Sequence, residues 1–291
     1  MNQLVLRTPA KINLCLNVLG KRPDGYHEVE MLMQAVGLYD DISIRIAASG
    51  VTVRCSDTAV PGGDGNIGCR AARELLDLSG RREGVAIDIT KRIPVAAGLG
   101  GGSSDAAAVL VACNRLFGLG LGRDRLAEIG TRLGMDVPFF LYGPTALARG
   151  RGEVLTALPA PAAFWVLLVN PGFETSTAWA YKNLNFGLTK KGDCNTIAGL
   201  NVRQIAESLH NDLETVTAAA HPVIGEMERS LLDSGALGAR MSGSGPTVFG
   251  IFETEKACRE AAQRLQTKGW RLYPAEILTG PLYGDHLAPA S

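Results

Sequence analysis

A glycine-rich stretch followed by two serines is the strongest chemical signal in the sequence. It reads PVAAGLGGGSSDAAAVLVACNRLFG over residues 94–118 and places four glycines within five residues before an apolar, helix-like run. Backbone without side chains lets several N–H groups converge on an anion, and the N-terminus of the following helix adds partial positive charge. We therefore favour a phosphate-binding loop over a flexible loop with a capped helix. Ser103 and Ser104 stand where that helix begins, so each either caps it or offers its hydroxyl to the phosphate.

Spacing excludes the common phosphate-binding motifs. A P-loop requires G-x-x-x-x-G-K-[ST], but the only Gly-Lys pair of the chain, Gly20-Lys21, is followed by Arg22. A dinucleotide-binding fingerprint requires G-x-G-x-x-G/A, and Ser103 occupies its last position here. The HRD and DFG signatures of protein kinases are absent as well. The loop therefore belongs to another class of nucleotide-binding protein.

The N-terminal segment TPAKINLCLNV, residues 8–18, alternates polar and apolar residues as a half-buried strand does. Strict alternation would place Lys11, Asn13, Cys15 and Asn17 on one face and Ile12, Leu14, Leu16 and Val18 on the other. The lysine and the first asparagine then point the same way. That arrangement suits a charged ligand, although a solvated strand edge would show the same pattern.

The turn RPDGYHE, residues 22–28, presents an aromatic ring and an imidazole side by side. A tight Asp-Gly bend precedes Tyr26 and His27. The two side chains either pack against the protein or form a platform that stacks on a base and hydrogen-bonds to it.

Asp136 is a carboxylate in apolar surroundings, within GMDVPFF at residues 134–140. A proline at the first turn of a short helix would make Asp136 the cap of that helix. The functional alternative is a partly desolvated carboxylate that accepts or orients the proton of a hydroxyl group. The residues alone leave both open.

A second glycine loop lies near the C-terminus, in ARMSGSGPTVFGIF at residues 239–252. It opens a strand, so its bare backbone can approach either a phosphate or the first loop. A tight turn between strands is the simpler alternative.

These groups must be positioned by a chain that mixes strands and helices. Alternation predicts strands in much of residues 3–90 and at 145–149, with helices at 66–78, 103–117 and 124–133. The proline-containing stretch LPAPAA at 158–163 separates this half from the next, so we predict domains 1–158 and 159–291. Beyond it we expect strands at 164–169, 247–252 and 271–277, helices at 201–213, 222–232 and 255–267, and an irregular segment at 171–196. This order lacks the regular alternation of a doubly wound sheet, so we predict an α+β fold.

Composition describes an ordinary globular protein of 291 residues. Hydrophobic residues make up 46% of the chain, and 29 basic residues balance 29 acidic ones, so we expect neither nucleic acid nor membrane as a partner. The six cysteines form no C-x-x-C pair, which predicts reduced, mostly buried thiols rather than a zinc site or a disulfide framework. Without a leader or a long apolar run, we expect a cytoplasmic protein that is a monomer or a weak homodimer.

Taken in order, PAKINL, RPDGYHE, GLGGGSSDAA, GMDVPFF and MSGSGPTVFG resemble the GHMP kinase superfamily over about residues 8–250. Within it, DGYH together with GMDVPFF is similar to the branch that acts on a cytidine-diphosphate-linked methylerythritol. The resemblance implies a two-domain α+β fold: an N-terminal ribosomal-protein-S5-like domain, a C-terminal ferredoxin-like domain, and an active site in the cleft between them. It also implies transfer of the γ-phosphoryl of ATP, with Mg²⁺ accompanying the nucleotide, to the substrate's 2-hydroxyl. That reaction belongs to the non-mevalonate route to isoprenoid precursors.

The resemblance also assigns roles to single residues. It implies Lys11 and Asp136 as the catalytic pair, and it identifies no metal ligand. It implies an ATP site made of Asn66, Lys91, Pro94, Val95, Ala96, Ala97, Gly98, Leu99, Gly100, Gly101, Gly102, Ser103 and Ser104. It implies a substrate site made of Asn13, Tyr26, His27, Asp136, Thr177 and Tyr181. Two departures stand out: many members have glycine where this chain has Ala96 or Ala97, and residues 182–200 match no pattern, which leaves cytidine contacts there open.

Two other functions remain open at this stage. One is a different GHMP small-molecule kinase, of the mevalonate-pathway or homoserine type, which would not need the Tyr26-His27 pair. The other is a non-catalytic nucleotide-binding regulator on the same fold. The presence of both Lys11 and Asp136 argues against a regulator.

Overall fold

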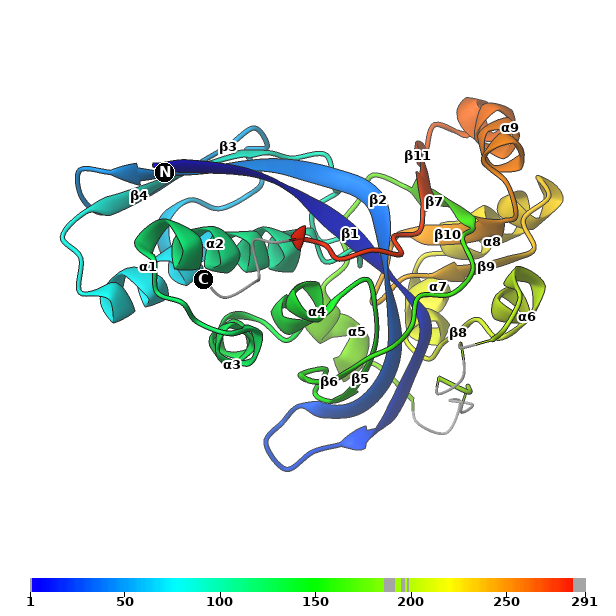
Figure 1. Ribbon diagram of the computed structural model, residues 1–291. Coiled ribbons are helices and arrows are strands. Elements are labelled where there is room, and N and C mark those ends of the chain that lie inside the picture. The colour runs from blue at the N-terminus through cyan, green and yellow to red at the C-terminus, as the bar shows by residue number, and fades with distance from the viewer. Residues whose placement is uncertain (1, 186–191, 195–196, 198, 285–291) are drawn as a thin grey trace.

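Two sheets and the helices that cover them make up the fold in the computed structural model, which describes residues 2–185, 192–194, 197 and 199–284 (Figure 1). Both sheets are mainly antiparallel, and helices are interspersed among their strands without a repeating β-α unit. The predicted α+β class is confirmed. No helix within the described ranges is long and apolar enough to cross a membrane.

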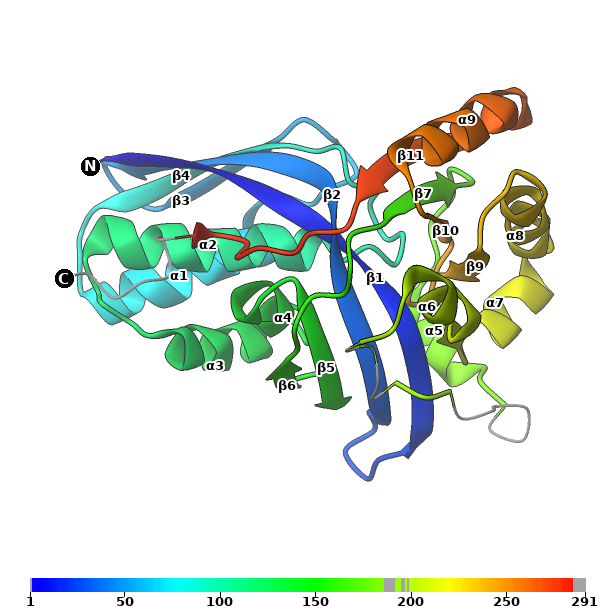
Figure 2. The same ribbon diagram turned by 45° about the vertical axis from the view of Figure 1, so that its right-hand side comes forward.

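A long curved hairpin organises the first sheet. Its strands β1 (Gln3–Lys21) and β2 (His27–Ala47) run from the N-terminal layer down to a turn at the far end of the molecule (Figure 2). The strands that extend this sheet are β3 (Val51–Cys55), β4 (Gly84–Thr90), β5 (Thr145–Gly150), β6 (Val154–Ala157) and β8 (His210–Asn211). The order β3-β4-β2-β1-β8 places β2 at the centre and β1 between β2 and β8, while β5 pairs with the turn-proximal part of β2 and with β6.

Helices cover one face of this sheet around a core of small and branched side chains. The helices of this half are α1 (Ile67–Ser79), α2 (Gly101–Phe117), α3 (Arg123–Leu133) and α4 (Val137–Tyr142), with a short 3₁₀ turn η1 (Gly63–Gly65) before α1. Asn66 caps α1, accepting from the N–H groups of Gly68 and Cys69, and left-handed Gly80 ends it. The α2 helix begins at Gly101, two residues earlier than predicted, because left-handed Gly100 is its N-cap. Both serines therefore lie inside its first turn and cap nothing.

A bulge in β1 makes the predicted alternation wrong beyond Asn13. Asn13 pairs with Met33 and Cys15 with Leu32, so Leu14 has no partner of its own. The extra residue reverses the direction of the side chains that follow, as far as the next register shift between Val18 and Gly20. Leu16 therefore faces the side that Lys11 and Asn13 face, whereas Cys15 joins the hydrophobic cluster of Ile12 and Leu14. A single-strand period cannot reveal such a bulge, because it depends on the partner strand.

The second sheet has the order β11-β7-β10-β9 and is antiparallel throughout. Its strands are β7 (Trp165–Asn170), β9 (Gly238–Met241), β10 (Val248–Phe252) and β11 (Arg271–Glu276). The helices of this half are α5 (Thr177–Lys182), α6 (Val202–Glu207), α7 (Glu214–Ala220), α8 (Val223–Asp233) and α9 (Glu255–Leu265), and the 3₁₀ turn η3 (Gln266–Lys268) follows α9. Figure 2 shows α8 and α9 beside this sheet.

Two expectations for this half are wrong. The segment predicted to be irregular contains α5, whose start is capped by Ser176. The helix predicted over 201–213 ends at Glu207, and the chain then forms β8 beside β1. Asp212 explains the change, because its Oδ2 accepts the N–H of Val18 at 2.7 Å and fastens this segment to the first sheet. That partner is almost 200 residues away and leaves no local sequence signal.

The chain passes from the first sheet to the second between β6 and β7, and the predicted boundary after residue 158 lies between these two strands. The halves are not independent, since β8 joins β1 and Val36 bridges Ile277. The division into domains 1–158 and 159–291 stays a prediction.

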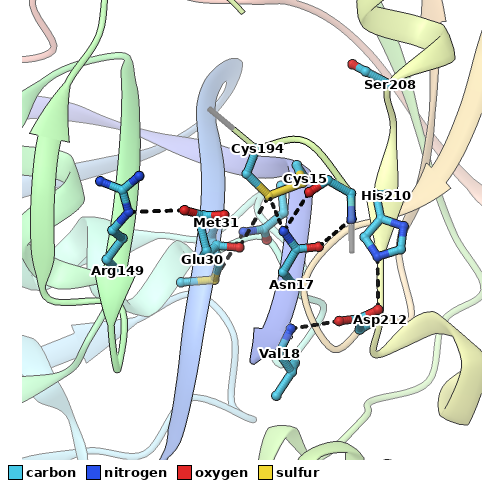
Figure 3. The surroundings of a disulfide bond; sticks show 12 residues. Cys15, Asn17, Val18, Glu30, Met31, Arg149, Cys194, Ser208, His210 and Asp212 are labelled. Carbon is cyan, nitrogen blue, oxygen red and sulfur yellow. Dashed lines mark hydrogen bonds and ion pairs between the residues drawn. A yellow bond between two sulfur atoms is a disulfide. The ribbon is translucent and has the colours of Figure 1, made fainter. Parts of the chain in front are cut away.

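A disulfide corrects the expectation that all cysteines are reduced. Cys15 on β1 is bonded to Cys194, 179 residues later, and the cross-link joins β1 to the segment that precedes α6 (Figure 3). Asn17 stands beside it, with its side-chain amide donating to Gly192 O and accepting from Gly192 N, each at 2.8 Å. The other four cysteines are free thiols, three of them buried. Spacing could not reveal this pair, because the fold alone brings the two residues together.

Candidate active site

A large cavity of about 1080 Å³ lies between the two halves of the molecule. Both halves contribute to its wall, the first through β1, the turn after it and the first glycine loop, the second through α5 and the second glycine loop. The volume is at the upper end for small-molecule pockets, which suits two ligands bound together. The predicted site residues that line it are Lys11, Asn13, Tyr26, His27, Asn66, Lys91, Pro94, Val95, Ala96, Ala97, Gly98, Gly100, Gly101, Gly102, Ser103, Asp136, Thr177 and Tyr181.

Two predicted residues are not part of this wall. Leu99 is buried in the second hydrophobic cluster, and Ser104 is fully buried in α2. Leu99 still holds the loop in place, because its carbonyl accepts the N–H of Lys11 at 2.9 Å. The cytidine contacts left open at 182–200 fall partly outside the described residues.

The first glycine loop has the backbone conformation that glycine permits. Gly98 and Gly100 have φ values of +76° and +70°, and Gly100 passes directly into α2. Ala96 also has a positive φ, +47°, at one of the two positions where many relatives were expected to have glycine. The loop thus presents its backbone to the cavity at the N-terminus of a 17-residue helix, which is an anion-binding arrangement.

The second glycine loop packs against the first. Ser242 donates its hydroxyl to Gly98 O at 3.0 Å, and a Cβ on Gly98 would lie only 2.0 Å from Ser242 O. Asn211 donates to the carbonyls of Met241 and Gly243 at 2.7 and 2.8 Å, which fixes this loop to β8. Of the alternatives left open by the sequence, approach to the first loop is confirmed, and the segment is also the turn between the paired strands β9 and β10.

Lys11 and Asp136 are brought together where the two loops meet. The ammonium of Lys11 donates to Asn13 Oδ1 at 2.6 Å and lies 4.0 Å from Asp136 Oδ2. Lys11 is 4% exposed, and this burial lowers its pKa, an effect that the negative charge of Asp136 opposes. A cation with so little water around it is well suited to interact strongly with transferred charge.

Asp136 does not serve as a helix cap. It precedes α4, but its side chain makes no capping hydrogen bond, and its carboxylate is one-third exposed at the cavity wall. Pro138 and the buried phenylalanines hold the start of α4 in place, so the backbone of Asp136 rests on a rigid element. The capping alternative is therefore wrong for the Asp136 carboxylate.

The aromatic residues gather at the other end of the cavity. The turn that carries them is closed by the N–H of Arg22 donating to Tyr26 O at 2.8 Å, with left-handed Gly25 at the bend. The imidazole of His27 stacks on Tyr181 at 4.9 Å between ring centroids, and Tyr26 is 49% exposed. Burial lowers the pKa of His27, and nearby Lys21 adds to this effect.

The remaining predicted residues are held by the protein itself. The hydroxyl groups of Thr177 and Ser244 form a hydrogen bond of 2.9 Å, which joins α5 to the second glycine loop. Asn66 caps α1, as described above. Lys91 is enclosed by two carboxylates, those of Asp40 and Asp105. Burial raises the pKa of Asp105 to about 6, although the positive charge of Lys91 opposes this shift.

Sequence reasoning missed cations at the aromatic end. Arg151 and Lys21 line the cavity there, and the guanidinium of Arg151 lies 4.9 Å from the centre of the Tyr26 ring. Glu153 holds Arg151 by accepting from its Nε at 3.1 Å. No local signal marks Arg151, because only the pairing of β5 with β2 brings its loop to Tyr26.

Comparison with known proteins agrees with this arrangement. The model of the GHMP kinases N terminal domain matches residues 66–144, and that of the GHMP kinases C terminal domain matches residues 197–270. A 4-diphosphocytidyl-2-C-methyl-D-erythritol kinase from Geobacter metallireducens is 52% identical, covering 91% of this chain and 95% of that protein. A crystal structure of 4-(cytidine 5'-diphospho)-2C-methyl-D-erythritol kinase is 33% identical, with a TM-score of 0.84, covering 95% of this chain and all of the other.

The fold extends beyond this group. A homoserine kinase structure from Cytophaga hutchinsonii has a TM-score of 0.75 at 21% identity, covering 97% of this chain and 96% of the other, which is a likeness of fold. High identity over nearly the whole length, by contrast, is found with proteins that share one name. The chain belongs to the GHMP kinases and, among them, to the family of the 4-diphosphocytidyl-2-C-methyl-D-erythritol kinases.

Proposed function

We propose that the protein transfers the γ-phosphoryl group of ATP to the 2-hydroxyl of 4-diphosphocytidyl-2-C-methyl-D-erythritol, a step in non-mevalonate isoprenoid precursor biosynthesis. One observation carries the proposal most directly. The Lys11–Asp136 pair lies in the same cavity as the glycine loop at the N-terminus of α2 and the His27–Tyr181 stack. A nucleotide site, an acceptor site and a charged pair between them are the parts that phosphoryl transfer needs.

At the nucleotide end, backbone and helix supply the positive charge. Residues 95–98 and 100–103 line the cavity, and their N–H groups bind the triphosphate with the partial charge of the α2 N-terminus behind them. Gly98 and Gly100 give this backbone its shape. Asn66 lines the same end and lies near the adenosine.

At the reaction centre, Asp136 accepts or orients the proton of the 2-hydroxyl while Lys11 neutralises charge on the transferred group. The 4.0 Å separation of the pair places one end of the carboxylate within reach of the ammonium and leaves the rest open to the cavity. Phosphoryl transfer depends mainly on positioning and charge stabilisation, so a buried lysine contributes much more here than in water.

At the aromatic end, Tyr26, His27 and Tyr181 bind the cytidine. The lowered pKa of His27 keeps the imidazole neutral near pH 7, so that one ring nitrogen donates and the other accepts. This pair of roles matches the donor and acceptor edge of a cytosine. Asn13 and Thr177 complete the acceptor site from β1 and α5.

Magnesium enters as part of the nucleotide substrate, MgATP. Within the described ranges, no three His, Cys, Asp or Glu side chains form a cluster that could hold a metal ion. In nucleotide enzymes Mg²⁺ is commonly bound by substrate phosphates with few protein carboxylates. Among the described residues, Asp105 and Asp136 are the carboxylates that line the cavity, which fits that pattern.

Replacing Asp136 tests the assignment. We expect Asp136→Asn to reduce turnover by about 10³-fold while ATP still binds, because Asp136 belongs to the acceptor side. Turnover is measured with the cytidylated substrate, and ATP affinity by calorimetry. Asp124→Asn is the matched control, since the exposed carboxylate of Asp124 accepts from the hydroxyl of half-buried Tyr142 away from the cavity. Near-normal turnover in Asp136→Asn would defeat the proposed mechanism.

A further inference from the structure

A buried ionic cluster adjoins the phosphate-binding loop and is not explained by the roles assigned so far. The ammonium of Lys91 lies 2.5 Å from Asp40 Oδ2 and 2.9 Å from Asp105 Oδ2. Thr8 donates its hydroxyl to Asp105 Oδ1 at 2.8 Å. All four side chains are at most 6% exposed, and burying charged groups at this depth carries a desolvation cost that their pairing offsets only in part.

The cluster holds the two ends of the loop. At the entry, Asp40 Oδ1 accepts the backbone N–H groups of Arg92 and Ile93 at 2.5 and 2.9 Å, just before residue 94. At the exit, Asp105 is the fifth residue of α2, three residues after Gly102. Lys91 therefore connects Asp40, which binds the entry of the loop, with Asp105, which follows its exit.

Gly101 shows how closely the lysine fits below the loop. A Cβ at this position would lie 3.0 Å from Lys91 Nζ and 3.0 Å from a side-chain carbon of Ile93. The ammonium thus occupies the space that a side chain at the start of α2 would fill. The glycine there is required for close packing, whereas its φ is not in the left-handed region.

We propose that Asp40, Lys91 and Asp105 form a clamp that joins the ends of the phosphate-binding loop and positions its N–H groups for the triphosphate. They are positioning residues, and Lys91 acts through the two carboxylates. The inference rests on the proposed kinase function. It differs from the role implied for Lys91 by sequence resemblance, which is contact with the nucleotide.

The direction in which one substitution changes ATP affinity distinguishes a clamp from a simple electrostatic effect. Asp105→Asn removes a negative charge close to the triphosphate site, so charge alone would make ATP bind more tightly. The clamp predicts the reverse, because the amide cannot accept from both Thr8 and Lys91 and the exit of the loop is released. We expect ATP to bind about tenfold more weakly, while the KM of the cytidylated acceptor stays within about twofold of wild type.

The experiment measures the Kd of ATP by calorimetry in the full-length protein, together with KM for each substrate. Asp41→Asn is the matched control, since Asp41 adjoins Asp40 in sequence but pairs with half-exposed Arg92 at the surface. An exposed pair of this kind contributes little, so its ATP affinity is expected to be unchanged. Asp40→Asn is expected to weaken ATP binding as Asp105→Asn does.

Hydrogen exchange gives a second measurement that does not need turnover. Amides of residues 92–104 are expected to exchange faster in nucleotide-free Asp105→Asn than in wild type, and at the wild-type rate in Asp41→Asn. Tighter or unchanged ATP binding in Asp105→Asn, or unchanged exchange of these amides, would overturn the clamp. If Asp40→Asn does not fold, Asp105→Asn decides. A wild-type protein that binds ATP but phosphorylates no acceptor would defeat the proposed function and leave the ATP test of the clamp intact.

Discussion

Contact between the two glycine loops is predicted to be essential, and Gly98→Ala tests it. Alanine at this position has two costs. The first is strain, because a non-glycine residue at a φ of +76° costs about 1–2 kcal/mol. The second is a collision, because the new Cβ would lie 2.0 Å from Ser242 O. Since real Cβ contacts are not closer than 3.0 Å, the loops must separate by about 1 Å.

Gly118→Ala measures the strain by itself. Gly118 ends α2 with a φ of +65°, and a Cβ there meets nothing within 4 Å. We expect this control to lose about 1–2 kcal/mol of unfolding free energy and to keep wild-type kinetics, because the helix end lies outside the cavity wall. The difference between the two variants therefore isolates the loop contact.

A displacement of this size next to Lys11 should be visible in catalysis. We expect Gly98→Ala to lose more stability than Gly118→Ala and to reduce kcat/KM for ATP by about 10²-fold. Urea unfolding and steady-state kinetics measure the two effects. If Gly98→Ala does not fold, Ser242→Ala tests the same contact by removing the hydroxyl that bridges to Gly98 O, without adding atoms. Kinetics and stability in Gly98→Ala equal to those of Gly118→Ala would refute the reasoning.

Three further predictions concern other parts of the molecule. Tyr26→Ala should raise the KM of the cytidylated substrate by about tenfold and leave the KM of ATP unchanged. An equal rise in both KM values would reject the cytidine site. Burial and the neighbouring carboxylate of Glu214 raise the pKa of Glu228 from 4.5 to about 8. Because the folded protein holds this proton more tightly than the unfolded chain, the free energy of unfolding falls as the pH rises toward and through 8. Thermal unfolding should therefore show that wild type loses on the order of 2 kcal/mol of unfolding free energy between pH 6 and 9 and that Glu228→Gln loses much less. Parallel stability–pH profiles of the two proteins would contradict this. Cys194→Ser should cost on the order of 3 kcal/mol and make thermal unfolding insensitive to a dithiol reductant, whereas wild type, with its Cys15–Cys194 bond, should be sensitive; equal sensitivity in both would argue against the cross-link.

The features that the sequence predicted correctly are local ones. The glycine loop before a helix, the Asp-Gly turn carrying Tyr26 and His27, and the start of α1 at Asn66 each depend on neighbours within a few residues. Proximity of Lys11 to Asp136 was implied by resemblance, and the structure brings the two side chains to 4.0 Å. Their catalytic roles stay a prediction until turnover is measured.

The features that were missed depend on distant partners. The bulge at Leu14 is defined by the register against β2, and it decides that Leu16 rather than Asn17 faces the cavity. The partner of Cys15 is 179 residues away, and β8 is defined by its pairing with β1, to which Asp212 also binds. No period or spacing within one segment contains this information.

The position of Lys91 shows the same limit at the site itself. Resemblance to the family implied that Lys91 contacts the nucleotide, and Lys91 does line the cavity. The resemblance could not reveal that Asp40 and Asp105, which come from other elements, surround the ammonium in the fold. The position of a residue in the sequence can thus predict where it lies in the fold, but it does not predict which partners its side chain binds.

The most direct test of the account is a phosphorylation assay with the purified protein and MgATP. Three acceptors are compared: 4-diphosphocytidyl-2-C-methyl-D-erythritol, mevalonate and homoserine, with products identified by mass spectrometry and phosphorus NMR. We expect phosphorylation of the first alone, at its 2-hydroxyl, and loss of that product in Asp136→Asn. Phosphorylation of mevalonate or homoserine, or ATP binding without transfer to any of the three, would contradict the proposed function.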